Sequence, residues 1–228
     1  MAQLHRVVIR GILAFVLLAA PLTMLGWFAA CPQYGDPTCP SSNNPMAVMS
    51  AFRDANAHVQ QLFLLLNLLA PYVYPLSYLV LGLLALKRAP WLATLGMICG
   101  WAGGIAWGFI ADTMFHITIF AQAGTDQLFV SHENSFFTLP YVLAIATGWV
   151  IGHLLGYILL GIALFRSRAI PRWASVLLIL SAPVMGPIAY GTNIGAFQLV
   201  GYLMVFIASI PAALVLLKTD HQLSELIP

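Results

Sequence analysis

The residues best suited to chemistry stand near the end of a long apolar segment, residues 91–121. Asp112 and His116 are four positions apart there, so one helix would present them on neighbouring turns. A carboxylate beside an imidazole can bind a metal ion, orient a base or form a local hydrogen bond. The pair therefore predicts the centre of a polar site, with an incidental local hydrogen bond as the alternative.

Two further histidines stand at a similar depth, beside other apolar segments of the chain. His58 and His132 each lie just before such a segment begins. Counting about 1.5 Å of rise per helical residue brings both to the level of Asp112 and His116. We therefore predict that Asp112, His116, His58 and His132 form a metal site. The alternative is an ordinary solvated rim, because polar residues gather at the edge of any membrane protein.

His153 differs because it lies within an apolar segment. About twelve residues separate it from the basic end of that segment, which places it near mid-membrane. An ionisable side chain at that depth is a functional-site hypothesis by default. His153 and Tyr74 therefore form our candidate cofactor site, and a core histidine bonded to a tyrosine or a backbone carbonyl is the alternative. Haem is the weaker cofactor hypothesis, because no second histidine stands at this level. The identity of any cofactor stays open, with a metal ion as the first choice.

The composition shows which kind of secondary structure must position these residues. Of the 228 residues, 61% are hydrophobic and 7% are charged, whereas soluble domains carry roughly 25% charged residues. Six continuous apolar segments are each long enough to cross a bilayer as a helix. The sequence therefore predicts an all-α integral membrane protein, with residues 1–228 as a single transmembrane domain. The six predicted helices cover residues 7–30, 59–86, 91–121, 135–165, 173–190 and 194–217.

The basic residues predict the orientation of the chain. Eight of the nine Lys and Arg residues fall at the two termini, in the turn between helices 2 and 3, or in the turn between helices 4 and 5. Six spans place all four regions on one side, which the positive-inside tendency makes cytoplasmic. We therefore expect both termini in the cytoplasm and the protein in a cell membrane, with a bacterial inner membrane favoured. A cleaved or lipidated start is the alternative for the first segment.

The longest polar segment is the predicted extracytoplasmic loop, residues 31–57. Cys31 and Cys39 bracket a Gly/Pro turn on the oxidising side, which predicts a local disulfide. Two free thiols or a metal-binding pair are the alternatives. After Asn44 and Pro45, apolar residues recur at helical spacing. This spacing predicts either a short surface helix or an extension of helix 2.

Rows of small residues predict how two of the helices pack. Helix 3 and helix 4 each carry glycines at intervals of four residues, and such rows allow close approach in lipid. The rows are Gly96, Gly100, Gly104 and Gly108 in helix 3, and Gly148, Gly152 and Gly156 in helix 4. We predict that helices 3 and 4 pack through these rows, with a homodimer interface as the alternative. Each step of four residues also rotates the row by about 40°, so the first glycines and Asp112 do not face one neighbour.

A short sequence pattern suggests an internal repeat. Tyr78 and Gly82 end helix 2, and Tyr157 and Gly161 end helix 4 with the same spacing. Each pair precedes a basic turn with Pro and Trp, followed by another helix. The pattern predicts a parallel repeat of helices 2–3 and 4–5. The alternative is chance, because Pro, Trp and Arg are frequent at membrane interfaces.

The sequence leaves three classes of function. A formal net charge of +2 without a basic block argues against nucleic acid as a partner. The bilayer is the expected partner, and a homo-oligomer or a larger membrane complex stays open. Our first hypothesis is a metal- or cofactor-binding polar pocket at the extracytoplasmic rim, whose catalytic role is undecided. The alternatives are a small transporter or binding protein for a hydrophobic ligand, and an accessory membrane subunit.

Overall fold

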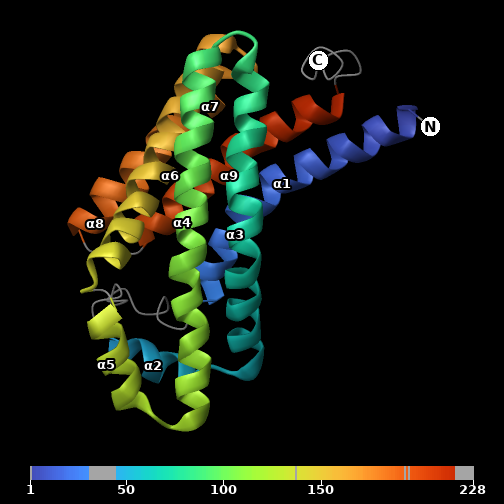
Figure 1. Cartoon of the computed structure of the whole chain (residues 1–228). Coiled ribbons are helices and arrows are strands. Elements are labelled where there is room, and N and C mark those ends of the chain that lie inside the picture. Colours follow the sequence, from blue (N-terminus) through green and yellow to red (C-terminus); the bar gives the residue numbers. More distant parts are fainter. Residues whose placement is uncertain (1, 31–44, 137, 193, 195, 219–228) are drawn as a thin grey trace.

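A computed structural model describes residues 2–30, 45–136, 138–192, 194 and 196–218, and this part of the chain consists of helices joined by short turns (Figure 1). At some of these positions, including 110–115, only the backbone is described. The elements are α1 (Ala2–Ala30), α2 (Pro45–Asp54), α3 (Ala57–Leu86), α4 (Pro90–Ala123), α5 (Asp126–Phe136), α6 (Pro140–Ser167), α7 (Arg172–Pro183), the π-helical turn η1 (Val184–Ile188), α8 (Ala189–Thr192) and α9 (Ala196–Lys218). No strand occurs among the described residues.

Five helices have the length and composition of membrane spans. They contain the stretches Leu4–Gly26, Ala57–Leu86, Pro90–Phe109, Pro140–Ser167 and Ala196–Lys218. Many of their large apolar side chains are exposed, as expected of surfaces that face lipid. The structure therefore fits a multi-pass membrane protein.

The fifth predicted helix is interrupted. The α-helical geometry of α7 ends at Pro183, the wider turn η1 contains Pro187, and α8 then adds one short turn. Proline lacks an N–H and crowds the carbonyl four residues earlier, and local π geometry accommodates such a defect. The apolar helix Arg172–Ile188 is shorter than the five spans. The sixth span therefore stays a prediction.

The helices α3 and α4 are too long for the bilayer alone. With 30 and 34 residues they extend about 45 and 51 Å, whereas the hydrocarbon core is about 30 Å thick. Figure 1 shows α2 and α5 beside the excess length, at one end of the molecule. We call α2, α5 and the adjoining ends of α3 and α4 the helical cap.

The cap corrects one predicted boundary, and at a second boundary it favours the separate short helix over an extension of helix 2. The fourth predicted helix began near Ser135, but that residue belongs to α5, and α6 starts separately at Pro140. Proline suits the first turn of a helix, where its missing N–H costs nothing. At the other boundary, α2 is separate from α3 because Asn56 caps α3 and accepts a 3.0 Å hydrogen bond from the Val59 N–H. The cap has its own apolar core of Met49, Phe52, Phe63, Ile117 and Phe129.

The closest helix contacts lie between α4 and α6. A Cβ added to Gly103 would lie 2.6 Å from the backbone nitrogen of His153, and one added to Gly152 would lie 2.9 Å from the Gly103 Cα. A Cβ on Gly156 would lie 2.7 Å from the Gly100 Cα. The two backbones therefore approach at distances that leave no room for larger residues.

The glycines of α4 do not all face α6. An added Cβ at Gly96 meets Leu160 of α6, but at Gly104 and Gly108 it meets prolines of α3. The row therefore turns from one neighbour to the next, in line with its rotation around the helix. Gly148 of α6 meets nothing within 4 Å. That the glycine rows drive the association of α4 with α6 stays a prediction.

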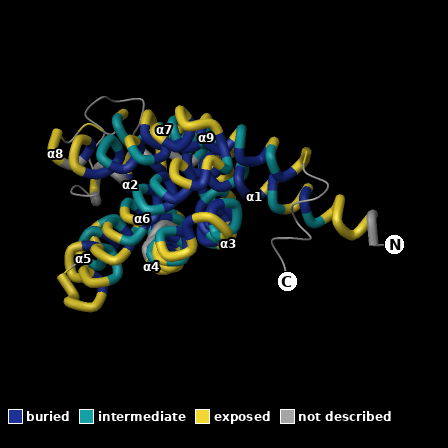
Figure 2. Tube along the Cα trace, turned by 90° about the horizontal axis from the view of Figure 1, so that it is seen from above, coloured by how far each residue is buried: buried dark blue, intermediate teal, exposed yellow. Residues whose placement is uncertain are grey.

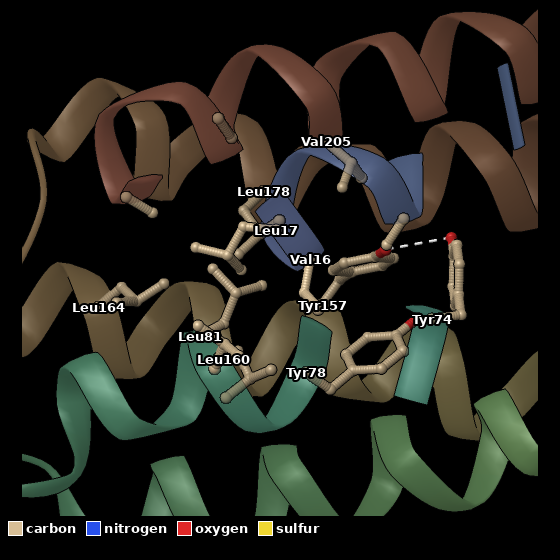
Figure 3. Close-up of a cluster of buried hydrophobic side chains, with 14 of the residues drawn as sticks. Val16, Leu17, Tyr74, Tyr78, Leu81, Tyr157, Leu160, Leu164, Leu178 and Val205 are labelled. Atoms are coloured by element: carbon tan, nitrogen blue, oxygen red, sulfur yellow. Dashed lines mark hydrogen bonds between the residues drawn. The ribbon is translucent and has the colours of Figure 1, made fainter. Parts of the chain in front are cut away.

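The main core lies where the spans meet. Figure 2 shows buried residues concentrated between α1, α6, α7 and α9, whereas most of α5 is exposed or intermediate. Figure 3 shows Tyr74, Tyr78 and Tyr157 among aliphatic side chains in this core, including Leu17 and Leu81. Aromatic rings therefore fill the centre of the bundle.

Candidate functional site

The helical cap brings two of the predicted metal ligands together. Gly124 ends α4 with a φ of 67°, a left-handed conformation that glycine adopts without strain. The chain then reverses into α5, so that His116 of α4 faces His132 of α5. Their ring centroids are 5.1 Å apart and the rings are nearly perpendicular. Two imidazoles distant in sequence therefore share one site.

A carboxylate adjoins this histidine pair. Glu133 Oε1 lies 3.2 Å from His132 Nδ1, and only 7% of Glu133 is exposed. Burial raises the pKa of the Glu133 carboxyl above its usual range, whereas the hydrogen bond to His132 acts in the opposite direction. Phe136 stacks on the His132 ring, and Phe120 lies against it. The polar pair is thus partly shielded from water.

The other two predicted ligands are placed differently. His58 is exposed in the first turn of α3 and has no described contact with His116 or His132. Asp112 lies one turn before His116 in α4, but its side chain is outside the described part of the structure. Among the described side chains, no group of three His, Cys, Asp or Glu residues could hold a metal ion as placed. The metal assignment therefore stays a prediction.

Glu133 was absent from the predicted ligand set. Its sequence signal was its position beside His132, yet the burial that distinguishes it depends on α5 being a helix packed in the cap. An ion pair between Arg53 of α2 and Asp126 of α5 joins the two short helices of this region. The cap is therefore a folded unit rather than a pair of loops.

The second predicted site lies in the aromatic core. The Tyr74 ring makes edge contacts with Tyr78, Trp149, Tyr157 and Tyr202, at centroid distances of 5.6, 5.7, 6.5 and 6.2 Å. The Tyr157 hydroxyl donates a 3.1 Å hydrogen bond to the Tyr74 hydroxyl (Figure 3). Tyr74 is therefore the centre of a packed aromatic cluster.

His153 joins this cluster through Trp149. Its ring stacks on the Trp149 indole at 4.0 Å, and its Nδ1 lies 2.7 Å from the Trp149 carbonyl oxygen one turn earlier. The residue is 3% exposed. This backbone hydrogen bond satisfies one polar atom of His153 without any cofactor. The cofactor role of His153 and Tyr74 stays a prediction, and the structure gives it less support than it gives the cap.

The cysteines divide between described and undescribed parts of the chain. Cys31 and Cys39 lie within residues 31–44, outside the described residues, so the predicted disulfide has no structural test. Cys99 of α4 is a free thiol.

Comparisons with known proteins assign the chain to no family. No family model matches it, and neither does any curated protein or any solved structure. The functional interpretation therefore depends on the residues and their arrangement.

Proposed function

We propose that this chain is a membrane protein that binds a divalent transition-metal ion in its helical cap. The observation that supports the proposal is the meeting of His116 and His132 from two antiparallel helices, 5.1 Å apart between ring centroids. Imidazole nitrogen suits zinc, copper and nickel ions. Because Asp112 lies one turn before His116, its carboxylate is the third ligand in this proposal, and water completes the coordination.

Glu133 has a distinct role in the proposed site. When His132 Nδ1 carries the proton, it donates to Glu133 Oε1 across the 3.2 Å distance. The other ring nitrogen, Nε2, is then the metal ligand. A carboxylate that holds a ligating histidine in this way orients the ring and makes it a stronger ligand. The proposed ligand set leaves out His58, which is exposed.

We further propose six spans with the cap on the extracytoplasmic side. Figure 1 shows α7 starting beside the end of α6 and α8 lying far from that point, where α9 begins its return. The interrupted stretch α7–η1–α8 would then be the sixth crossing. The basic turns lie at the end opposite the cap, which favours a cytoplasmic position for that end in a cell membrane.

Metal binding is tested by titrating Zn²⁺ into purified, chelator-treated protein in a calorimeter. We expect a single site in the wild type and at least about tenfold weaker binding after His116→Ala or His132→Ala. His58→Ala is the matched control, because it removes an exposed histidine at the same end of the molecule. Equal binding by the wild type and a folded His116→Ala, His132→Ala variant would contradict the proposal.

A second candidate function is the binding or transport of a hydrophobic ligand. It is favoured by η1, because π-helical turns and interrupted spans are frequent at functional sites of membrane proteins. The residues beside the interruption are closely packed, with Gly201 against Met185 and Gly186 against Leu154. A variant that loses zinc yet keeps saturable uptake of an apolar solute by vesicles would favour this candidate. If the protein neither binds zinc nor takes up an apolar solute, the accessory-subunit hypothesis remains.

A further inference from the structure

Two basic turns lie together at the end of the bundle opposite the cap (Figure 1). Lys87 and Arg88 lie between α3 and α4, and Arg166, Arg168 and Arg172 lie at and beside the turn between α6 and α7. The two turns are in direct contact, because Arg88 Nη1 donates a 2.9 Å hydrogen bond to the Ser167 carbonyl oxygen. We call these five residues the basic patch.

The hydrogen bond from Arg88 fixes the patch without neutralising it. The Ser167 carbonyl belongs to the last turn of α6, where backbone oxygens lack helical partners and carry partial negative charge. The contact uses one donor of a guanidinium group that has five. The planar group is therefore held in place, and donors remain that suit a phosphate.

No described carboxylate forms an ion pair with any of the four arginines of the patch. The acidic residues within the described helices are Asp54, Asp112, Asp126 and Glu133, and all four belong to the opposite half of the molecule, in or near the cap. Arg172 is held over the Phe165 ring at 5.5 Å rather than by a described acid. The four arginines therefore form a local excess of positive charge.

The backbone conformation of Arg168 is unusual for an arginine. Arg168 ends α6 with a φ of 54°, a left-handed conformation that glycine usually occupies at this position. It is the one non-glycine residue with positive φ in the described part of the chain. The turn thus carries an exposed arginine at a position where glycine would be less strained.

Two tryptophans indicate the depth of the patch. Trp91 is the second residue of α4 and is 82% exposed, and Trp173 is the second residue of α7 and is 52% exposed. Exposed tryptophan at the start of an apolar helix is typical of the headgroup level of a bilayer. The patch therefore lies where lipid phosphates lie, rather than in bulk water.

We infer that the basic patch binds the phosphate headgroup of an anionic phospholipid. The phosphate contacts Arg88, Arg168 and Arg172, which come from both turns. The acyl chains follow the exposed apolar surfaces of α4 and α7, beside Trp91 and Trp173. Basic clusters at the ends of membrane helices are recognised sites for anionic lipids, and the present patch adds a fixed arginine at the junction of two turns.

The inference is tested by thermal unfolding of the protein in mixed micelles. We expect phosphatidylglycerol to raise Tm by several degrees relative to phosphatidylcholine, and the rise to shrink at high salt. The Arg168→Gln, Arg172→Gln double variant changes two exposed residues and should lose most of the phosphatidylglycerol effect. Arg53→Gln breaks the Arg53–Asp126 ion pair in the cap, at the opposite end of the molecule, so it should lower the starting Tm and keep the phosphatidylglycerol-dependent rise.

Three outcomes would overturn the inference. The first is an equal rise in Tm with both lipids. The second is an unchanged phosphatidylglycerol effect in the double variant. The third is the same rise with inorganic phosphate at equal concentration, which would indicate a soluble anion instead of a lipid. Arg168→Lys should retain the effect in part, since it keeps the charge but loses the planar donor group.

Discussion

Among single residues, Glu133 combines a buried carboxyl group with a hydrogen bond to His132. An acidic side chain seldom lies in an apolar environment unless it is paired or protonated. In the cap it is 7% exposed, and its partner is one of the two converging histidines. This residue therefore links the stability of the cap to the chemistry of the proposed site.

A pH dependence follows for the metal-free protein. Because burial raises the pKa of Glu133, the folded state holds this proton more tightly than the unfolded chain does. The stabilising contribution of Glu133 is therefore complete below the unfolded pKa of about 4.3 and is lost as pH rises through the folded pKa. We expect the Tm of Glu133→Gln, relative to that of the wild type, to increase over this pH range.

The comparison uses thermal unfolding of both proteins in a chelating buffer at several pH values. Asp54→Asn is the control, because it removes an exposed carboxylate from the same cap. If the Tm difference between Glu133→Gln and the wild type stays constant, or falls as pH rises, then burial does not raise the pKa of this carboxyl group.

Among the elements, α4 and α6 approach most closely where small residues face each other. Gly103 and Gly152 allow the two backbones to touch, whereas other glycines of α4 contact α3. Without a hydrophobic force between helices in lipid, such close contact is a main source of association energy. The position of a glycine around its helix therefore decides which neighbour it contacts.

Substitution of glycine by alanine should distinguish these positions. In Gly103→Ala the new methyl group would lie 2.6 Å from the His153 backbone nitrogen, so the helices must separate. We expect a loss of about 1–3 kcal/mol in the free energy of unfolding. Gly148→Ala is the matched control on α6, where nothing lies within 4 Å, and it should gain up to about 1 kcal/mol from helix propensity.

Both alanine variants are compared by reversible unfolding in detergent. Similar stabilities for Gly103→Ala and Gly148→Ala would mean that the α4–α6 contact is looser than the structure indicates.

For the whole molecule, the cap and the basic patch lie at opposite ends of the spans. Figure 1 shows the N-terminal end of α1 and the C-terminal end of α9 directed towards one side, away from the cap. Helices longer than the bilayer then carry the histidine site out of the lipid, while the arginines stay at the headgroup level. Metal binding and lipid binding are therefore proposed for opposite faces of the membrane.

Labelling with a membrane-impermeant maleimide tests this arrangement. In a background with the native cysteines changed to serine, Ser131→Cys reports on α5 and Arg168→Cys reports on the basic patch. In intact cells we expect labelling of Ser131→Cys and protection of Arg168→Cys, with the reverse in inside-out vesicles. Labelling of both positions from one side would contradict the six-span arrangement.

The sequence alone was sufficient for the helical class and for most of the apolar segments. Few charges and long continuous apolar runs leave the backbone no other way to satisfy its hydrogen bonds in lipid. The sequence also showed that the glycine row of residues 96–108 must rotate around its helix. It did not identify Gly103, which lies outside the four-residue series yet makes the closest approach to α6.

Only the tertiary structure decided which polar groups meet. Four polar residues at one depth were candidates for the metal site, but depth along a helix does not specify which face a side chain occupies. The folding of residues 126–136 into α5 brought His132 to His116, buried Glu133 and left His58 exposed. The tertiary structure likewise placed Trp149, on which His153 stacks, against Tyr74 of α3. The composition of the chain indicates that lipid surrounds most of it. The rotation and contacts of its helices, in contrast, determined the arrangement of its sites.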